Sequence, residues 1–136
     1  MNPNLISIAP VPDDLAKPRG HYSHAVCAGG FVFVSGQLPV EADGRQLSEA
    51  PFEAQARQVL ANVQAALEAA GSNVAQLVQV RVYVTDMDQW PVFNRIYQPW
   101  AGAAPPARAV VPVPLLHHGF AIEVEAVAAL QSLPKQ

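Results

Sequence analysis

Arg108 is the residue that most directly suggests chemistry, because it stands in the apolar, proline-containing stretch PPARAVVPVP, from Pro105 to Pro114. No neighbour in this stretch can balance its charge, so the head group either reaches solvent or binds an anion from outside the chain. A guanidinium presents two parallel N–H donors that suit a carboxylate. The alternative is an ordinary ion pair with Glu123 or Glu125 across a sheet, and the residues alone leave both interpretations open.

Four histidines and one cysteine are the other residues that could bind a metal or react. His21 and His24 have an HxxH spacing, and His117 and His118 are adjacent. Residues three apart on an extended chain point to opposite faces, whereas zinc takes three or four converging ligands, so we predict no metal site. Cys27 is the only cysteine, which excludes an intrachain disulfide, and its apolar neighbours predict a small buried side chain rather than a nucleophile.

The composition predicts one oligomeric domain. The chain has 136 residues, of which 51% are hydrophobic and 14% are charged, against an average charged share near ~25%. A single domain over 1–136 that exposes this much apolar surface is expected to form a homo-oligomer. The net charge of −3 and the lack of a Lys/Arg cluster argue against a nucleic-acid partner. With neither a signal-like start nor an apolar run of about 18 residues, we expect a soluble cytoplasmic protein without membrane contact.

Two amphipathic helices are predicted. Apolar residues recur at helical spacing over 52–70, and Gly71 follows in the position favoured after a helix end. Five side chains are predicted to lie largely on the opposite, polar side of this helix: Gln55, Arg57, Gln58, Gln64 and Glu68. Asp86 or Asp88 can cap a second helix, which Pro99 closes.

Strands account for most of the remaining chain. After an irregular lead-in over 1–17, period-two or β-rich stretches cover 21–30, 31–40, 77–86, 107–113 and 120–130. Val78, Val80, Val82 and Val84 are predicted to share one face. The order β-β-α-β-α-β-β predicts an α+β fold, a mixed β-sheet with two helices packed on one face. The other face would be half buried by neighbouring subunits, and it carries Gln79, Arg81, Tyr83, Glu123 and Glu125.

A series of segments then identifies a family. GHYSHAV, VFVSGQLPV, FEAQARQVLANVQAALEAAGS, VQVRVYVTDMDQWPVFNRIY, PPARAVV and IEVEAVA follow one another with suitable spacing. Together they resemble the Rid family, also called the YjgF family, over about residues 17–130. No single motif is decisive, but the combination is specific.

This resemblance implies a fold, an assembly and an activity. It implies a chorismate-mutase-like α+β fold and a homotrimer with sites in clefts between subunits. It further implies hydrolytic deamination of enamines and imines, such as 2-aminoacrylate and 2-iminopropanoate, to 2-keto acids and ammonia. No cofactor is expected, and the expected partners are a small imino or keto acid and further copies of the chain.

The resemblance also assigns roles to two charged residues. Arg108 matches the family's substrate-binding arginine, and Glu123 matches a glutamate that can orient a water molecule and transfer a proton. Glu125 shares the strand face of Glu123 by period two. It is either the working acid instead or a structural partner of Arg81, and we favour Glu123.

The remaining site residues come from the same comparison. Tyr22 and Ser35 match residues that line the cleft, and Gly36 lets the backbone approach the substrate closely. Asn94 matches an asparagine that bonds the ligand or fixes the site. The carbonyl of Val110 is a further candidate for holding the water molecule.

Several positions depart from the family pattern. His21 stands where relatives usually carry proline, and Ala109 and Val110 replace a more polar pair after the arginine. The stretch VPVPLLHHGF replaces a commoner polar loop, and its His117 and His118 could rim the pocket. A bulkier or more hydrophobic imino acid is therefore expected.

Two other functions stay open. One is a non-catalytic protein of the same fold that binds 2-keto acids or related carboxylates. The other, RNA cleavage, is attributed to some relatives but is disfavoured by the charge balance.

Overall fold

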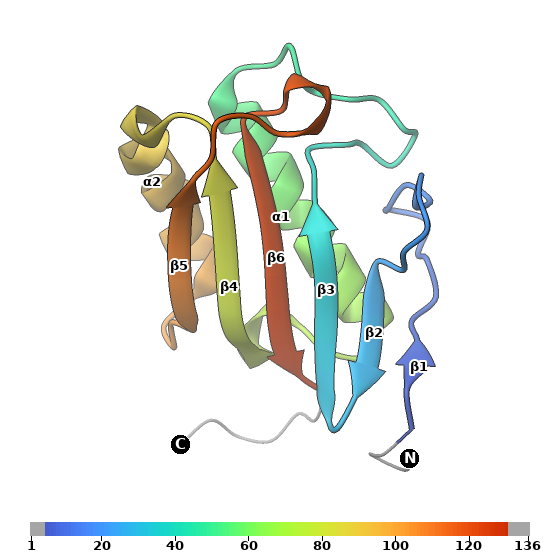
Figure 1. The fold of residues 1–136 in the computed structure, drawn as a ribbon. Helices are drawn as coiled ribbons and strands as arrows, with labels where there is room; N and C mark the ends of the chain where they lie inside the picture. Colours follow the sequence, from blue (N-terminus) through green and yellow to red (C-terminus); the bar gives the residue numbers. More distant parts are fainter. Residues whose placement is uncertain (1–4, 131–136) are drawn as a thin grey trace.

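The strands form one mixed sheet in the computed structural model, which describes residues 5–130 (Figure 1). They are β1 (Ser7–Ile8), β2 (Ala25–Ala28), β3 (Phe31–Gln37), β4 (Leu77–Val84), β5 (Ala107–Pro112) and β6 (Ile122–Ala129). The order across the sheet is β1-β2-β3-β6-β4-β5. β4 and β5 run parallel, whereas the other neighbouring strands are antiparallel. β5 is therefore an edge strand, next to a helix in sequence and in space.

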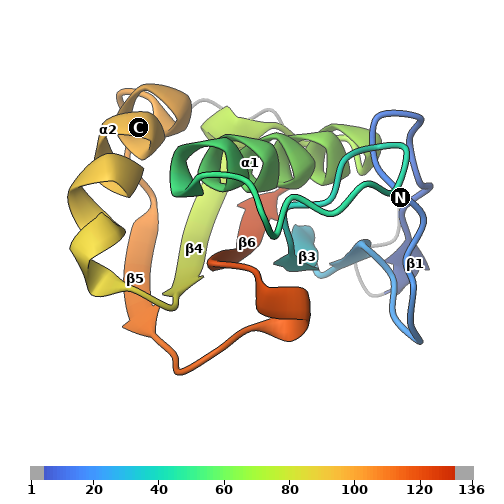
Figure 2. The same ribbon diagram turned by 90° about the horizontal axis from the view of Figure 1, so that it is seen from above.

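Helices α1 (Phe52–Ala69) and α2 (Trp90–Ala101) lie on the same side of this sheet (Figure 2). Short 3₁₀ turns cover Val74–Gln76, Met87–Gln89 and His117–Gly119. The core lies between the helices and the sheet, where Val59, Val63 and Phe93 of the helices are fully buried with Val80 and Val124 of the strands. The predicted α+β architecture, with both helices on one face, is confirmed.

Glycines set two of the turns. Gly29 and Gly30 join β2 to β3 with φ values of 60° and 85°, as a two-residue hairpin turn with two left-handed positions requires. Gly71 has a φ of 88° and ends α1 in the predicted position.

Three details of the elements differ from the sequence prediction. The lead-in over 1–17 contains β1, which pairs with β2. Asp86 caps the turn Met87–Gln89, where its side chain accepts from the N–H of Asp88, rather than α2 itself. Pro99 lies inside α2, which continues to Ala101 and ends at Gly102 with a φ of 83°. Proline removes only one hydrogen bond there, in the last turn of the helix.

Two side chains were assigned to the wrong environment. Val78 is 44% exposed because the β4–β6 register shifts between Leu77 and Gln79, and Leu77 is buried instead. Gln55 is only 3% exposed. Its amide donates to the carbonyl oxygens of Ser48 and Ala50, and its oxygen accepts from the N–H of Ala121. A buried amide with partners for both ends ties α1 to two loops.

Within residues 5–130 neither helix combines the length and the apolar character needed to cross a membrane.

Candidate functional site

Arg108 extends from the edge strand β5 onto one face of helix α2. It stands opposite Val80, a core residue, so its side chain leaves the sheet on the helix side. The guanidinium carbon lies 4.7 Å from the ring centre of Trp90 and 4.6 Å from that of Tyr97. Its Nη1 donates to Oδ1 of Asn94 at 3.3 Å. Residues 90, 94 and 97 repeat at helical spacing, so one face of α2 provides all three contacts to the guanidinium. We call these three residues, Trp90, Asn94 and Tyr97, the seat of Arg108.

This seat stabilises a cation without an anion. Aromatic faces attract a guanidinium through their quadrupole, and Arg108 forms no ion pair with a carboxylate among residues 5–130. Asn94 occupies one of its donors, which leaves the others available to a ligand. A groove of about 480 Å³ runs beside it, lined also by Asn94, Tyr97 and residues after them, among them Gly102 and Pro105. The alternative interpretation of Arg108, an ion pair with Glu123 or Glu125, is wrong.

Glu123 lies on β6 and faces the other side of the sheet, opposite Tyr83. Its carboxylate packs against Gly36, in a bulge where the β3–β6 register shifts between Val34 and Gln37. A Cβ added to Gly36 would collide with the Glu123 carboxylate, so the absence of a side chain makes this approach possible. Burial, with a smaller contribution from Glu125, raises the pKa of Glu123 above its ordinary value, although attraction to His117 lowers it in part.

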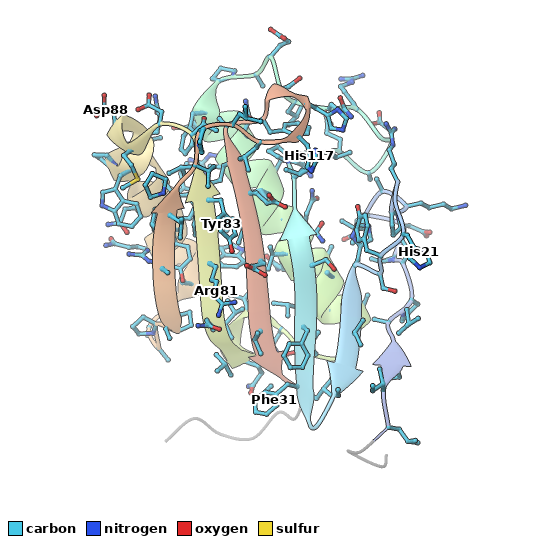
Figure 3. All side chains as sticks on the ribbon, in the orientation of Figure 1. His21, Phe31, Arg81, Tyr83, Asp88 and His117 are labelled. Carbon is cyan, nitrogen blue, oxygen red and sulfur yellow. The ribbon has the colours of Figure 1, made fainter. Side chains whose placement is uncertain are left out.

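Glu125 has structural partners on the same face. It accepts a hydrogen bond from the Tyr83 hydroxyl, and one of its oxygens lies 3.9 Å from Nη1 of Arg81. Figure 3 shows Arg81 and Tyr83 together on the outer face of β4. The hydrogen bond to Glu125 is the main reason that the pKa of Tyr83 is raised. Of the two carboxylates, Glu125 is therefore the one with hydrogen-bond and ion-pair partners among residues 5–130.

Tyr22 and Gly36 line a cavity of about 330 Å³ beyond the end of β3. His117 and His118 also line it, and Figure 3 shows His117 above the tip of β3. His21 is not among its lining residues. The Tyr22 ring is half exposed and meets the edge of His24, with ring centres 5.9 Å apart.

His24 and Ser35 hold the wall of this cavity in place. Nε2 of His24 lies 2.6 Å from the carbonyl oxygen of Ala16, so this nitrogen carries the hydrogen, and Nδ1 accepts from the Gln37 amide at 3.1 Å. Oγ of Ser35 donates to the carbonyl oxygen of Ser23 at 2.5 Å. Both side chains are therefore already hydrogen-bonded to other residues of the chain. No group of three or more His, Cys, Asp or Glu residues suited to a metal ion occurs in the described part of the chain.

The predicted site residues fall into two groups in one copy of the chain. Asn94 and Arg108 meet on the helix side of β5, and Val110 points to the same side, opposite Val82. The second group lies around the end of β3 and the outer face of β6, and it comprises Tyr22, Ser35, Gly36 and Glu123. Arg108 and Glu123 project from opposite faces of the sheet, so a single copy does not bring them together. Alternation in the sequence did not assign Arg108 to a face, because the register of β5 against β4 comes only from the structure.

A family model described as endoribonuclease L-PSP matches residues 13–130. The chain belongs to this family. Within the L-PSP family, it is 38% identical over 116 residues to a RutC family protein of Pyrococcus horikoshii, covering 85% of this chain and 92% of the relative. The crystal structure of the Escherichia coli YjgF gene product, 34% identical, superposes with a TM-score of 0.84 over 92% of this chain and 100% of that one.

A third relative carries a ligand. The crystal structure of Escherichia coli TdcF with bound serine is 31% identical, with a TM-score of 0.84 over 90% of this chain and 98% of that one. The L-PSP family thus includes the YjgF protein that the sequence motifs resemble, and the family prediction is confirmed.

Proposed function

We propose that this protein hydrolyses reactive 2-imino and enamine acids to 2-keto acids and ammonia, with 2-aminoacrylate, 2-iminopropanoate or a bulkier imine as substrate. The observation that carries the proposal is the seat of Arg108. Its guanidinium rests on Trp90 and Tyr97, is oriented by Asn94 and has no carboxylate partner among the described residues. A substrate carboxylate would supply the missing anion through two charge-assisted hydrogen bonds.

The complete site is proposed to form between copies of the chain, in a homotrimer. Arg108 and Glu123 lie on opposite faces of one sheet, so a substrate that contacts both requires each from a different copy. The outer face of the sheet also exposes apolar side chains, with Phe31 at 41% and Phe33 at 48% exposure. Covering such a face is a common reason for association.

Glu123 would carry the proton transfers. An enamine is first protonated at carbon to give the imine, water then adds to the C=N carbon, and the resulting amino alcohol releases ammonia as its nitrogen gains a proton. A raised pKa keeps a larger fraction of the Glu123 carboxyl groups protonated near neutral pH, so that they can donate a proton. The ionised form can in turn accept a proton from the attacking water. The products are the 2-keto acid and ammonia.

One observation favours a second candidate function, the binding of small carboxylates without turnover. TdcF was crystallised with serine bound, and it is 31% identical to this chain. In that case Arg108 would anchor the ligand in the same way, while Glu123 would only orient it.

The test is an imine-loss assay. An amino-acid oxidase generates the imine from alanine, semicarbazide traps what survives, and the trapped product is measured with wild type, Arg108→Ala and Glu123→Ala. Arg57→Ala is a matched control, because Arg57 is an exposed arginine on α1 that pairs with Glu53. The proposal predicts faster imine loss with wild type and the control, but not with Arg108→Ala. Binding of keto acids through Arg108 without any imine loss would instead identify a binding protein.

A further inference from the structure

The cavity beyond β3 has a basic lining that the proposed chemistry does not use. Its walls include Lys17 and Arg19 together with His24, His117 and His118, and they include no aspartate or glutamate. This is unusual in a chain whose net charge is −3. A concave surface lined by one sign of charge concentrates ligands of the opposite sign.

The two cations of this cavity are not neutralised by the protein. Neither Lys17 nor Arg19 forms an ion pair with a carboxylate among residues 5–130. Two acidic side chains of the neighbouring loop have other partners. Glu41 lies 3.9 Å from Nη1 of Arg45, and Asp43 accepts from the Arg45 N–H at 2.9 Å.

The loop at Gly44 packs closely against the guanidinium of Arg19. Nη2 of Arg19 donates to the carbonyl oxygen of Gly44 at 3.2 Å. Gly44 has a φ of 92°, and a Cβ there would lie 2.7 Å from that nitrogen. One hydrogen bond thus positions the guanidinium at the cavity wall and leaves its other donors for a ligand.

Much of the uncharged lining is apolar or already hydrogen-bonded. Leu15, Leu38 and Val40 contribute aliphatic surface. Nδ2 of Asn62 donates to the carbonyl oxygens of Leu38 and Val40, and the Gln37 amide bonds His24. Such walls suit a short hydrocarbon chain, with the two cations available to an anionic group at its end.

We propose that this cavity binds a second acidic group of the substrate, so that the preferred substrates are 2-imino acids derived from amino dicarboxylic acids. The inference rests on the proposed function, because the cavity adjoins Glu123 through Gly36. Arg108 of another copy would take the carboxylate next to the imine, and Arg19 and Lys17 would take the distal one. The substrate would then be bulkier, as expected from the sequence, and its far end would carry a carboxylate.

The test compares the binding of 2-oxoglutarate and 2-oxopentanoate to the intact protein by isothermal titration calorimetry. These keto acids have the same chain length and differ in a terminal carboxylate against a methyl group. We expect wild type to bind 2-oxoglutarate about tenfold more tightly, the factor that corresponds to about 1.4 kcal/mol. In Arg19→Gln and Lys17→Gln the preference should shrink while the affinity for 2-oxopentanoate is unchanged. Arg57→Gln, outside the cavity, should keep the preference.

Three results would overturn the inference: equal or tighter binding of 2-oxopentanoate, no binding of 2-oxoglutarate, or a preference that survives in the double variant Lys17→Gln/Arg19→Gln. The proposed function fails separately, because binding requires no turnover. If imines from glutamate and norvaline both decay at the uncatalysed rate while 2-oxoglutarate is still preferred, the cavity inference stands and the deaminase proposal falls.

Discussion

Replacing Arg108 by lysine keeps the positive charge and removes the planar guanidinium. The guanidinium covers the rings of Trp90 and Tyr97 and uses one N–H group to donate to Asn94. An ammonium group concentrates its donors on one atom and cannot present two parallel bonds to a carboxylate. Loss of one charge-assisted hydrogen bond costs about 1.5–3 kcal/mol, which is roughly a ten- to 150-fold decrease in kcat/KM.

The assay is imine loss with the alanine-derived imine, over a range of substrate concentrations. The carboxylate is bound in both ground and transition states, so the decrease should appear mainly as a higher KM. Arg95→Lys is the matched control, since Arg95 is an exposed arginine on the same helix that pairs with Glu53 at 3.8 Å. Activity of Arg108→Lys within threefold of wild type would refute the reasoning, because charge alone would then suffice.

Three further outcomes follow from the same structure. Burial raises the pKa of Glu123, so folding disfavours the ionised form of this side chain. Glu123→Gln should therefore melt at a higher temperature than wild type at pH 8. The two proteins should melt alike below about pH 4.3, the pKa of glutamate in an unfolded chain. A variant that melts below wild type at pH 8 would contradict this. Gly36→Ala should abolish imine loss while its melting temperature stays close to that of wild type, because the new Cβ would displace Glu123; retained activity would show that Glu123 tolerates the shift. Tyr97→Phe should leave urea stability unchanged or raise it by up to about 1 kcal/mol, because the buried hydroxyl of Tyr97 has no hydrogen-bond partner among residues 5–130. A loss above about 2 kcal/mol would indicate a missed partner.

The sequence predicted the elements where a regular period extends over many residues. The apolar repeat over 52–70 and the alternation in β4 both correspond to elements of the structure. The prediction failed where one residue interrupts the period. The register shift at Val78 exposes a side chain that alternation places in the core, and Pro99 is tolerated because it lies in the last turn of α2.

Polarity was also misleading at Gln55, which was assigned to the solvent side of α1. Its burial depends on two loop carbonyls and the Ala121 N–H, which are far from it in sequence. Tertiary hydrogen bonds of this kind leave no mark in a local pattern.

The site residues themselves could be named from the family motifs, but not their separation. Arg108 and Glu123 were expected to act on one substrate, and the sheet places them on opposite faces of the same chain. The aromatic support of Arg108 by Trp90 and Tyr97 was not predicted from the sequence either. Their spacing of seven residues, matched to an arginine on the next strand, was the available signal.

The most direct test of the account is to mix two inactive variants. Arg108→Ala and Glu123→Ala are combined in equal amounts, unfolded, refolded together and assayed for imine loss, with each variant refolded alone as the control. If each site takes Glu123 from one copy and Arg108 from another, random assembly restores about one quarter of the sites. The account therefore predicts recovery of roughly a quarter of the activity of refolded wild type. Activity no greater than that of the separate variants, when the mixed protein is folded and assembled, would contradict a site shared between copies.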